Sequence, residues 1–190
     1  MTIKAIVFAI ILLGAFGLFG LSLWRMIKLI SIGKPENRLD HLSERFKKMM
    51  TVAIGQSKLF REPIPGMMHA FIFWGFLVLL SSILEAIGEG LFSGFTFRFI
   101  GVFYQPLQFC QDLFAGLVTV GVCIALYRRY IFRPKRLQVD MHAQIDATAI
   151  LLTILFIMIS LLGQNAVRVR VDMNQGGHFF SSALAPIMTS

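Results

Sequence analysis

The stretch IPGMMHAFIFWGFLVLL, residues 64–80, decides the fold of this chain. The apolar run to which it belongs continues to residue 88, and about 20 apolar residues suffice for a helix to cross a bilayer. One titratable side chain, His69, lies within the stretch. A charged side chain at membrane depth costs roughly 2.5–3.5 kcal/mol or more, so an intramembrane histidine predicts a partner or a function.

The composition of the whole chain supports a membrane protein. Of its 190 residues, 56% are hydrophobic and only 15% are charged, whereas a soluble domain carries about 25% charged residues. The 18 Lys and Arg residues outnumber the 10 Asp and Glu residues. Cytoplasmic loops of membrane proteins concentrate Lys and Arg, so this excess does not indicate nucleic-acid binding. We therefore predict an all-α integral membrane protein.

The hydropathy pattern predicts one membrane domain over residues 1–190, with helices over about 3–30, 65–88, 106–132 and 142–162 and with cytoplasmic loops at 31–64 and 133–141. Gly88 and Gly90 serve as the stop signal of the second helix. A last apolar stretch, residues 179–188, is too short to span a bilayer. We expect the domain to continue beyond residue 190 in a longer parent protein.

Two local patterns predict how the helices are packed and connected. Gly14, Gly17 and Gly20 form a narrow stripe of small residues, which favours close helix packing. Within the basic segment 34–62, apolar residues recur at helical spacing. This segment is either an amphipathic helix on the membrane surface or a connecting helix docked on a partner domain.

The distribution of Lys and Arg predicts the topology. The segment 25–61 holds nine of them and the segment 128–136 holds five, against four on the other side. The excess places both basic loops in the cytoplasm and the N-terminus outside.

Two of the four histidines are expected at the same depth of the membrane. His69 lies about one turn inside the second helix, and His142 opens the fourth, both near the cytoplasmic face. A neutral imidazole in a helix bundle is a natural axial ligand of haem iron, so the two histidines are candidates to bind one haem. His178 is expected on the outer side, about 25–30 Å away from both, and His41 in a solvated loop.

A carboxylate accompanies His142. Asp146 follows it by four residues, which places both side chains on one face of a helix. Asp146 is therefore a candidate to orient the imidazole, as carboxylates do behind metal-ligating histidines. It could equally complement the helix dipole at the start of the fourth helix.

Three stretches resemble a known family. They are GKPENR at residues 33–38, PGMMHAFIFWGF at residues 65–76 and SSALA at residues 181–185. Together they resemble the membrane domain of heterodisulfide-reductase-related iron–sulfur oxidoreductases of the electron-transferring-flavoprotein:menaquinone oxidoreductase type. That domain is similar to the nitrate reductase gamma subunit, a b-type cytochrome.

The resemblance implies a gamma-subunit-like helix bundle with haem b in a bacterial or archaeal inner membrane. It also implies respiratory electron transport between a cytoplasmic iron–sulfur domain or subunit and menaquinone or another quinone, with electron-transferring flavoprotein as a further partner. His69 matches the family's haem ligand nearest the cytoplasm. Cys110 and Cys123 match no iron–sulfur motif, so such clusters are expected only in a partner or in a further domain.

The chain departs from the family pattern at two places. Leu79 stands where the gamma subunit has a second histidine, and the family's last helix with its ligands lies outside these 190 residues. The second ligand of His69 is thus His142, a histidine beyond residue 190 or one on another chain. The candidates to handle a quinone or its protons are Glu85 on the outer side or Asp146 on the inner side, and the sequence does not decide between them.

A second reading is a cofactor-free membrane anchor for a redox complex, in which His69 is a hydrogen-bonded histidine of the bundle. A transporter is less favoured, because the sequence shows no inverted repeat. A homo-oligomer is compatible with each of these readings.

Overall fold

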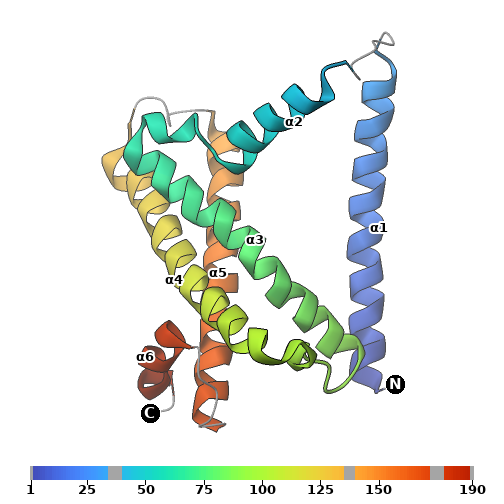
Figure 1. Ribbon diagram of the computed structural model, residues 1–190, viewed down its shortest axis with the longest axis vertical. Helices are drawn as coiled ribbons and strands as arrows, with labels where there is room; N and C mark the ends of the chain where they lie inside the picture. The colour runs from blue at the N-terminus through green and yellow to red at the C-terminus, as the bar shows by residue number, and fades with distance from the viewer. Residues whose placement is uncertain (1, 34–39, 135–139, 172–177, 189–190) are drawn as a thin grey trace. The chain divides into compact units, whose positions relative to one another are not determined.

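The computed structural model describes residues 2–33, 40–134, 140–171 and 178–188, and every regular element in these ranges is helical (Figure 1). Four helical stretches are long and apolar enough to cross a membrane: Ile3–Ser31, Pro63–Leu91, Phe97–Phe132 and Met141–Val171. The predicted fold class, all-α with four potential membrane spans and a short apolar C-terminal segment, is confirmed.

The chain forms two compact units. The first comprises Met1–Gly55 and Ile83–Thr96, and the second comprises Gln56–Ser82 and Phe97–Ser190. Helix α3 (Pro63–Leu91) contributes its first part to the second unit and its last part to the first.

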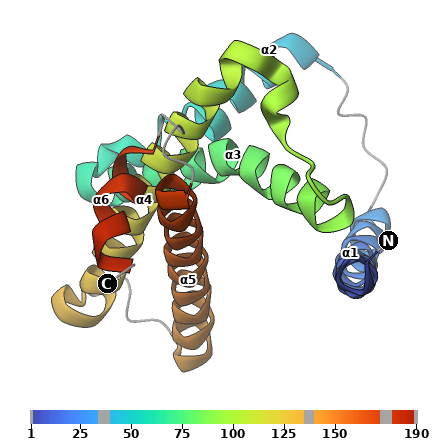
Figure 2. The ribbon, with the colours of Figure 1, turned by 90° about the horizontal axis from the view of Figure 1, so that it is seen from below.

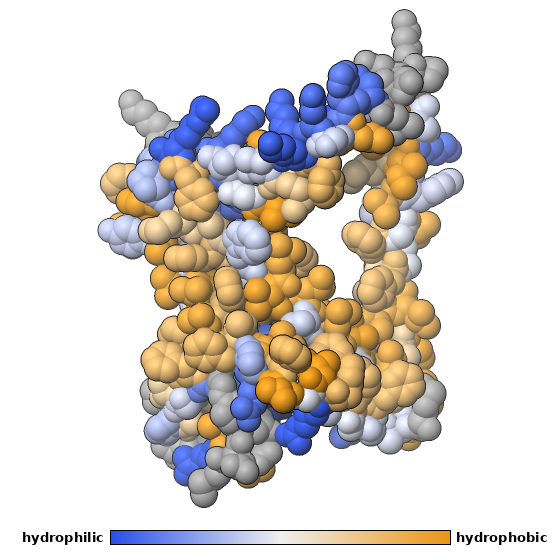
Figure 3. All heavy atoms as spheres, in the orientation of Figure 1, coloured by the Kyte–Doolittle hydropathy of each residue, from blue (hydrophilic) through white to orange (hydrophobic). Residues whose placement is uncertain are grey.

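The first unit contains α1 (Ile3–Ser31) and α2 (Leu42–Met49), which continues as a π-helical turn over Met50–Ile54. The hydroxyl of Thr2 caps α1 by accepting the backbone N–H of Ala5, and Ala5 is the one buried residue of this helix. Most of α1 exposes apolar side chains, and Figure 3 shows a largely hydrophobic surface along this helix with hydrophilic atoms toward its ends. Such a surface suits direct contact with lipid.

Helix α2 has the expected amphipathic character. Its exposed apolar residues Leu42, Phe46 and Met49 recur at helical spacing. Lys47 and Lys48 lie in its last turn, where cations complement the helix dipole. Figure 3 shows hydrophilic side chains gathered over α2.

The second unit is built from the first part of α3, α4 (Tyr104–Tyr127), α5 (Met141–Val171) and α6 (Phe179–Met188). Short 3-10 helices at Leu59–Arg61 and Phe97–Phe103 precede α3 and α4, and a π-helical turn at Arg128–Phe132 extends α4. Figure 2 shows α6 beside α4 and α5, and both helices contact it.

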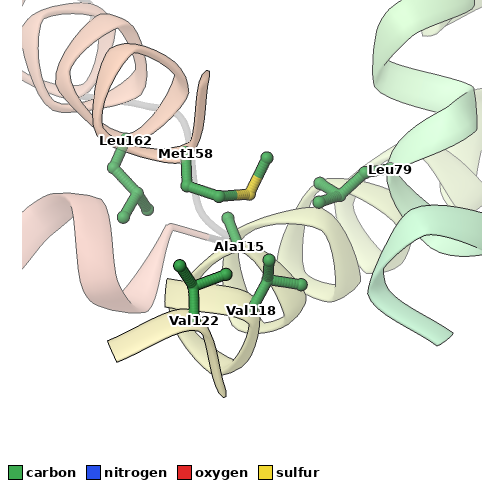
Figure 4. Packing of buried hydrophobic residues seen from close by; sticks show 6 residues of the cluster. All are labelled: Leu79, Ala115, Val118, Val122, Met158 and Leu162. Atoms are coloured by element: carbon green, nitrogen blue, oxygen red, sulfur yellow. The ribbon is translucent and has the colours of Figure 1, made fainter. Parts of the chain in front are cut away.

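The core of the second unit lies where α3, α4 and α5 meet. Figure 4 shows its buried side chains, which are Leu79, Ala115, Val118, Val122, Met158 and Leu162. The side chains of Leu79 on α3 and Met158 on α5 point toward one another across α4. Small residues at the centre allow the helices to approach closely, which is the usual way in which membrane helices gain packing energy.

Glycines bring α3 and α4 into close contact. A Cβ atom on Gly75 would lie 2.1 Å from the Cγ2 atom of Val118, and one on Gly121 would lie 3.2 Å from the carbonyl oxygen of Met68. By contrast, a Cβ on Gly14, Gly17 or Gly20 would meet nothing within 4 Å. The close packing predicted for the α1 stripe is thus absent from the described residues.

The second helix ends three residues beyond the predicted end near residue 88. Helix α3 passes through Gly88 and Gly90 and ends at Leu91. A Cβ on Gly88 would lie 2.2 Å from the ring of Phe95, and one on Gly90 would lie 2.6 Å from the ring of Phe8. These glycines therefore make room for aromatic rings of the first unit instead of ending the helix.

The predicted end of the fourth helix is wrong. Helix α5 continues past Gly163 to Val171 instead of ending near residue 162. Gly163, Asn165 and Ala166 are buried within it, and α5 contacts both α4 and α6. This packing stabilises about two and a half further turns beyond the predicted end.

Several predictions fall on residues outside the described ranges. They concern most of the GKPENR motif and the basic residues Lys135 and Arg136.

Candidate functional site

The imidazole of His69 is held by a glutamine that precedes α3. Its Nδ1 atom lies 3.3 Å from the Oε1 atom of Gln56, and its ring stacks on Phe73 one turn later, at 6.4 Å between ring centroids. Gln56 is 2% exposed and has a left-handed backbone, with φ of 49°. An amide oxygen only accepts hydrogen bonds, so this contact suits the tautomer of His69 that carries its proton on Nδ1.

The chain between Gln56 and His69 folds tightly against the start of α3. The 3-10 helix Leu59–Arg61 follows Gln56, and a Cβ on Gly66 would lie 2.6 Å from the carbonyl oxygen of Leu59. Glycine at position 66 thus permits the close backbone approach in the segment that brings Gln56 within hydrogen-bond distance of His69. The backbone path of residues 56–66 therefore positions Gln56 as the hydrogen-bond partner of the imidazole.

This geometry leaves the second ring nitrogen of His69 available. With the proton on Nδ1, the Nε2 atom carries a lone pair, which is the form of histidine that binds a metal. Metal-ligating histidines almost always donate their other N–H to an oxygen acceptor, and the Gln56 amide oxygen supplies one here. His69 is exposed, so its ring edge is accessible from outside the chain. The residues present fit one axial ligand of a haem.

His142 and Asp146 lie in the first turns of α5, and both are exposed. The structure records no hydrogen bond or ion pair between them or with His69 in the ranges it describes. In the second unit, the starts of α3 and α5 lie at the same end (Figure 1). The histidines therefore share an end of this unit, but no contact joins them.

The start of α5 is attached to the end of α4 by polar contacts. The guanidinium group of Arg129 donates to the carbonyl oxygens of Ala143 and Gln144 at 3.4 and 3.3 Å. The hydroxyls of Tyr130 and Thr148 lie 2.7 Å apart. These contacts fix the first turn of α5, which carries His142, against the end of α4.

Glu85 lies in the last part of α3, within the first unit. Its Oε1 atom accepts the hydroxyl of Thr96 at 2.7 Å, and the side chain is partly buried. This bond attaches the chain after α3 back onto the helix. His41, on the same unit, has a side chain that is 71% exposed, as expected for a solvated loop.

A buried polar cluster that the sequence analysis missed lies between α4 and α6. Asp112 has no exposed surface and accepts the backbone N–H groups of Phe180, at 2.6 Å, and Ser181, at 3.3 Å, together with the hydroxyl of Ser181. Its carboxylate thus caps the N-terminus of a helix that lies far away in sequence. An acidic residue inside an apolar span is itself a signal for such a role, and that signal was available in the sequence.

His178 completes this cluster. Its Nδ1 atom lies 3.9 Å from Oδ1 of Asp112, and its side chain is 4% exposed. In the described residues, neither ring nitrogen of His178 has a hydrogen-bond partner. Among the described residues, the imidazole of His69 thus has a hydrogen-bond partner, whereas the buried imidazole of His178 lies beside a carboxylate without a hydrogen bond.

Comparison with known proteins gives two distant relatives. Over 130 residues, 67% of its length, the chain is 29% identical to an EtfAB:quinone oxidoreductase of Syntrophomonas wolfei. Over 135 residues, 71% of its length, it is 28% identical to a probable iron-sulfur-binding oxidoreductase, FadF, of Bacillus subtilis.

The similarity concerns a minor part of each relative, since the matched region covers 18% and 19% of their lengths. No protein-family description and no solved structure matches the chain. The chain is therefore a helical membrane part that is distantly related to quinone-linked and iron–sulfur oxidoreductases.

Proposed function

We propose that this chain is the haem b-binding membrane domain of a quinone-linked oxidoreductase. The observation that carries the proposal is the imidazole of His69, which lies on a potential membrane span with its Nδ1 atom 3.3 Å from the Oε1 atom of Gln56, a pairing that suits the tautomer with Nε2 as the metal ligand. The similarity to a quinone oxidoreductase and to an iron–sulfur oxidoreductase supports it independently.

A haem b bound at His69 would supply one-electron transfer between quinone and a redox partner. Gln56 holds the imidazole in the tautomer that an iron ligand requires, and Phe73 fixes the plane of its ring. The second axial ligand in this proposal is His142, a histidine beyond residue 190 or one on another chain. Glu85 and Asp146 remain the proposed sites of quinone or proton handling.

The proposed partners and orientation follow from charge and from the relatives. The basic loops would face the cytoplasm of a bacterial or archaeal cell, where an iron–sulfur domain and electron-transferring flavoprotein would exchange electrons with the chain. Menaquinone or another membrane quinone is the proposed second substrate.

The test is a reduced-minus-oxidised absorption spectrum of the full-length protein in detergent, with a pyridine haemochrome assay. We expect a b-type α-band in the wild type and its loss or clear reduction in His69→Ala, because the free Nε2 ligand is removed. The matched control is His41→Ala, which removes a solvated imidazole and should leave the spectrum unchanged. An unchanged spectrum of His69→Ala would exclude His69 as a ligand.

A cofactor-free membrane anchor is the second candidate. The hydrogen bond between His69 and Gln56 favours an anchor, because it satisfies one ring nitrogen of the imidazole without a cofactor. An anchor predicts no α-band in the wild-type protein, even when the complete complex is purified.

A further inference from the structure

Helix α2 leaves an apolar face uncovered. No residue of α2 is buried against another part of the chain that the structure describes. Leu42, Phe46 and Met49 are exposed and follow one another at intervals of four and three residues, so they lie on one face of the helix. An exposed apolar face of this kind marks a surface that contacts another apolar phase, either a protein or the lipid bilayer.

Lysine side chains flank this apolar face on both sides. At about 100° per residue, Lys47 and Lys48 lie on opposite sides of it, each about 130° from its centre, and both are exposed. Arg45 is already paired with Asp40 at 2.8 Å, whereas neither lysine forms an ion pair within the described ranges. The helix thus combines an apolar face with two unpaired ammonium groups, which is the composition of helices that lie on anionic membranes.

The connections of α2 keep it near the bilayer. It begins at Leu42, 11 residues after α1 ends at Ser31, and α3 begins nine residues after the π-helical turn that extends α2. Both α1 and α3 are potential membrane spans, and 11 residues of extended chain reach at most about 40 Å. The end of α1 also carries residues typical of a membrane interface, since Nζ of Lys28 lies 5.4 Å from the ring centroid of Trp24. Lipid headgroups are therefore the surface that α2 meets at the highest effective concentration.

We propose that α2 lies in the membrane–water interface, with its apolar face among the acyl chains and with Lys47 and Lys48 bound to the phosphates of anionic lipids. The position of the two lysines favours lipid over a protein partner, because a helix that sinks its apolar face below the headgroups brings both flanks level with the phosphates. In the proposed topology this surface belongs to the cytoplasmic leaflet, whose surface potential is negative. The inference goes beyond haem and quinone chemistry, and it applies equally to a cofactor-free anchor.

The depth of a nitroxide label attached to α2 tests this position by electron paramagnetic resonance. The full-length protein is reconstituted into vesicles of phosphatidylcholine and phosphatidylglycerol after Cys110 and Cys123, which are exposed, have been replaced by alanine. We expect a label on Met49→Cys to lie about 5–10 Å below the phosphates, where oxygen reaches it better than a hydrophilic nickel complex does. A label on Glu44→Cys is the matched control, because position 44 lies on the opposite face of the helix and should be reached better by the nickel complex.

The two lysines are tested by removing either their charge or that of the lipid. In vesicles of phosphatidylcholine alone, the label on Met49→Cys should move toward the water. Replacing both lysines, as Lys47→Gln and Lys48→Gln, should give the same shallower position in both kinds of vesicle. Lys4→Gln removes an exposed cation near the other end of α1 and should leave the label at its wild-type depth.

Three results would overturn the proposal. Equal access of the nickel complex to the two labels would place α2 in water. Protection of both labels from both reagents would show that a protein covers the helix. An unchanged depth in phosphatidylcholine alone would exclude recognition of anionic lipid. None of these results bears on the haem, which is measured separately by the α-band.

Discussion

Replacing Asp112 by Asn should release α6 from α4. The carboxylate accepts two backbone N–H groups and one hydroxyl from the first turn of α6, and it has no exposed surface. An Asn side chain has one acceptor oxygen, and its NH₂ group would face donors. At least one donor at the start of α6 therefore loses its acceptor, and the remaining bonds lose their ionic character.

The free energy lost from the docking of α6 follows from the difference between hydrogen bonds to a charged and to a neutral acceptor. Hydrogen bonds to charged groups contribute about 1.5–3 kcal/mol and neutral ones about 0.5–1.5 kcal/mol. Three weakened bonds, offset in part by the smaller desolvation cost of a neutral side chain, give a net loss of about 1.5–3 kcal/mol. This loss changes the equilibrium between docked and undocked α6 roughly 10- to 150-fold.

Hydrogen–deuterium exchange of the full-length protein in detergent measures this equilibrium. Peptides that cover Phe179–Met188 should exchange faster in Asp112→Asn by that factor, while peptides from α1 should not change. Asp146→Asn makes the same chemical change at an exposed site and should leave α6 protected. If α6 were equally protected in Asp112→Asn, the carboxylate would not be what holds it.

Two further predictions concern the packing of α3 and the haem ligand. Gly75→Leu should destabilise the protein by about 1–3 kcal/mol, because the new side chain overpacks against Val118. The control is Gly17→Leu, which should be nearly neutral because a Cβ there meets nothing within 4 Å. Equal melting temperatures for the two variants would contradict the packing argument. Gln56→Ala should retain the α-band but shift the reduction potential of the haem, because the imidazole of His69 loses its hydrogen-bond acceptor. A potentiometric titration that gave the wild-type reduction potential would show that Gln56 does not act on the iron.

The sequence predicted the spans well and their ends poorly, for different physical reasons. A run such as residues 64–80 must be helical in lipid, because no other structure satisfies its backbone there. The end of a helix depends on tertiary packing. Gly88 and Gly90 are typical stop signals, but they lie within α3, where the rings of Phe95 and Phe8 pack against them.

The residues of the candidate site also differ in how far the sequence alone predicts their surroundings. The placement of His69 on a long apolar helix was predictable, because a titratable group within an apolar span is easily recognised in the sequence. Its partner Gln56 was not, since their contact requires a left-handed backbone and a 3-10 helix between them. Asp112 was equally conspicuous, but its partners Phe180 and Ser181 are known only once the chain has folded.

The cap on α6 has a consequence for biosynthesis. Asp112 precedes Phe180 by 68 residues, so at about 5–20 residues per second a ribosome needs roughly 3–14 s to make the partner after the aspartate. During that time α4 carries a carboxyl group with no N–H donors from α6, at a cost of about 2.5–3.5 kcal/mol if it is charged within the bilayer. Synthesis of α6 removes that cost, so membrane insertion of α4 is completed by a helix that the ribosome makes two helices later.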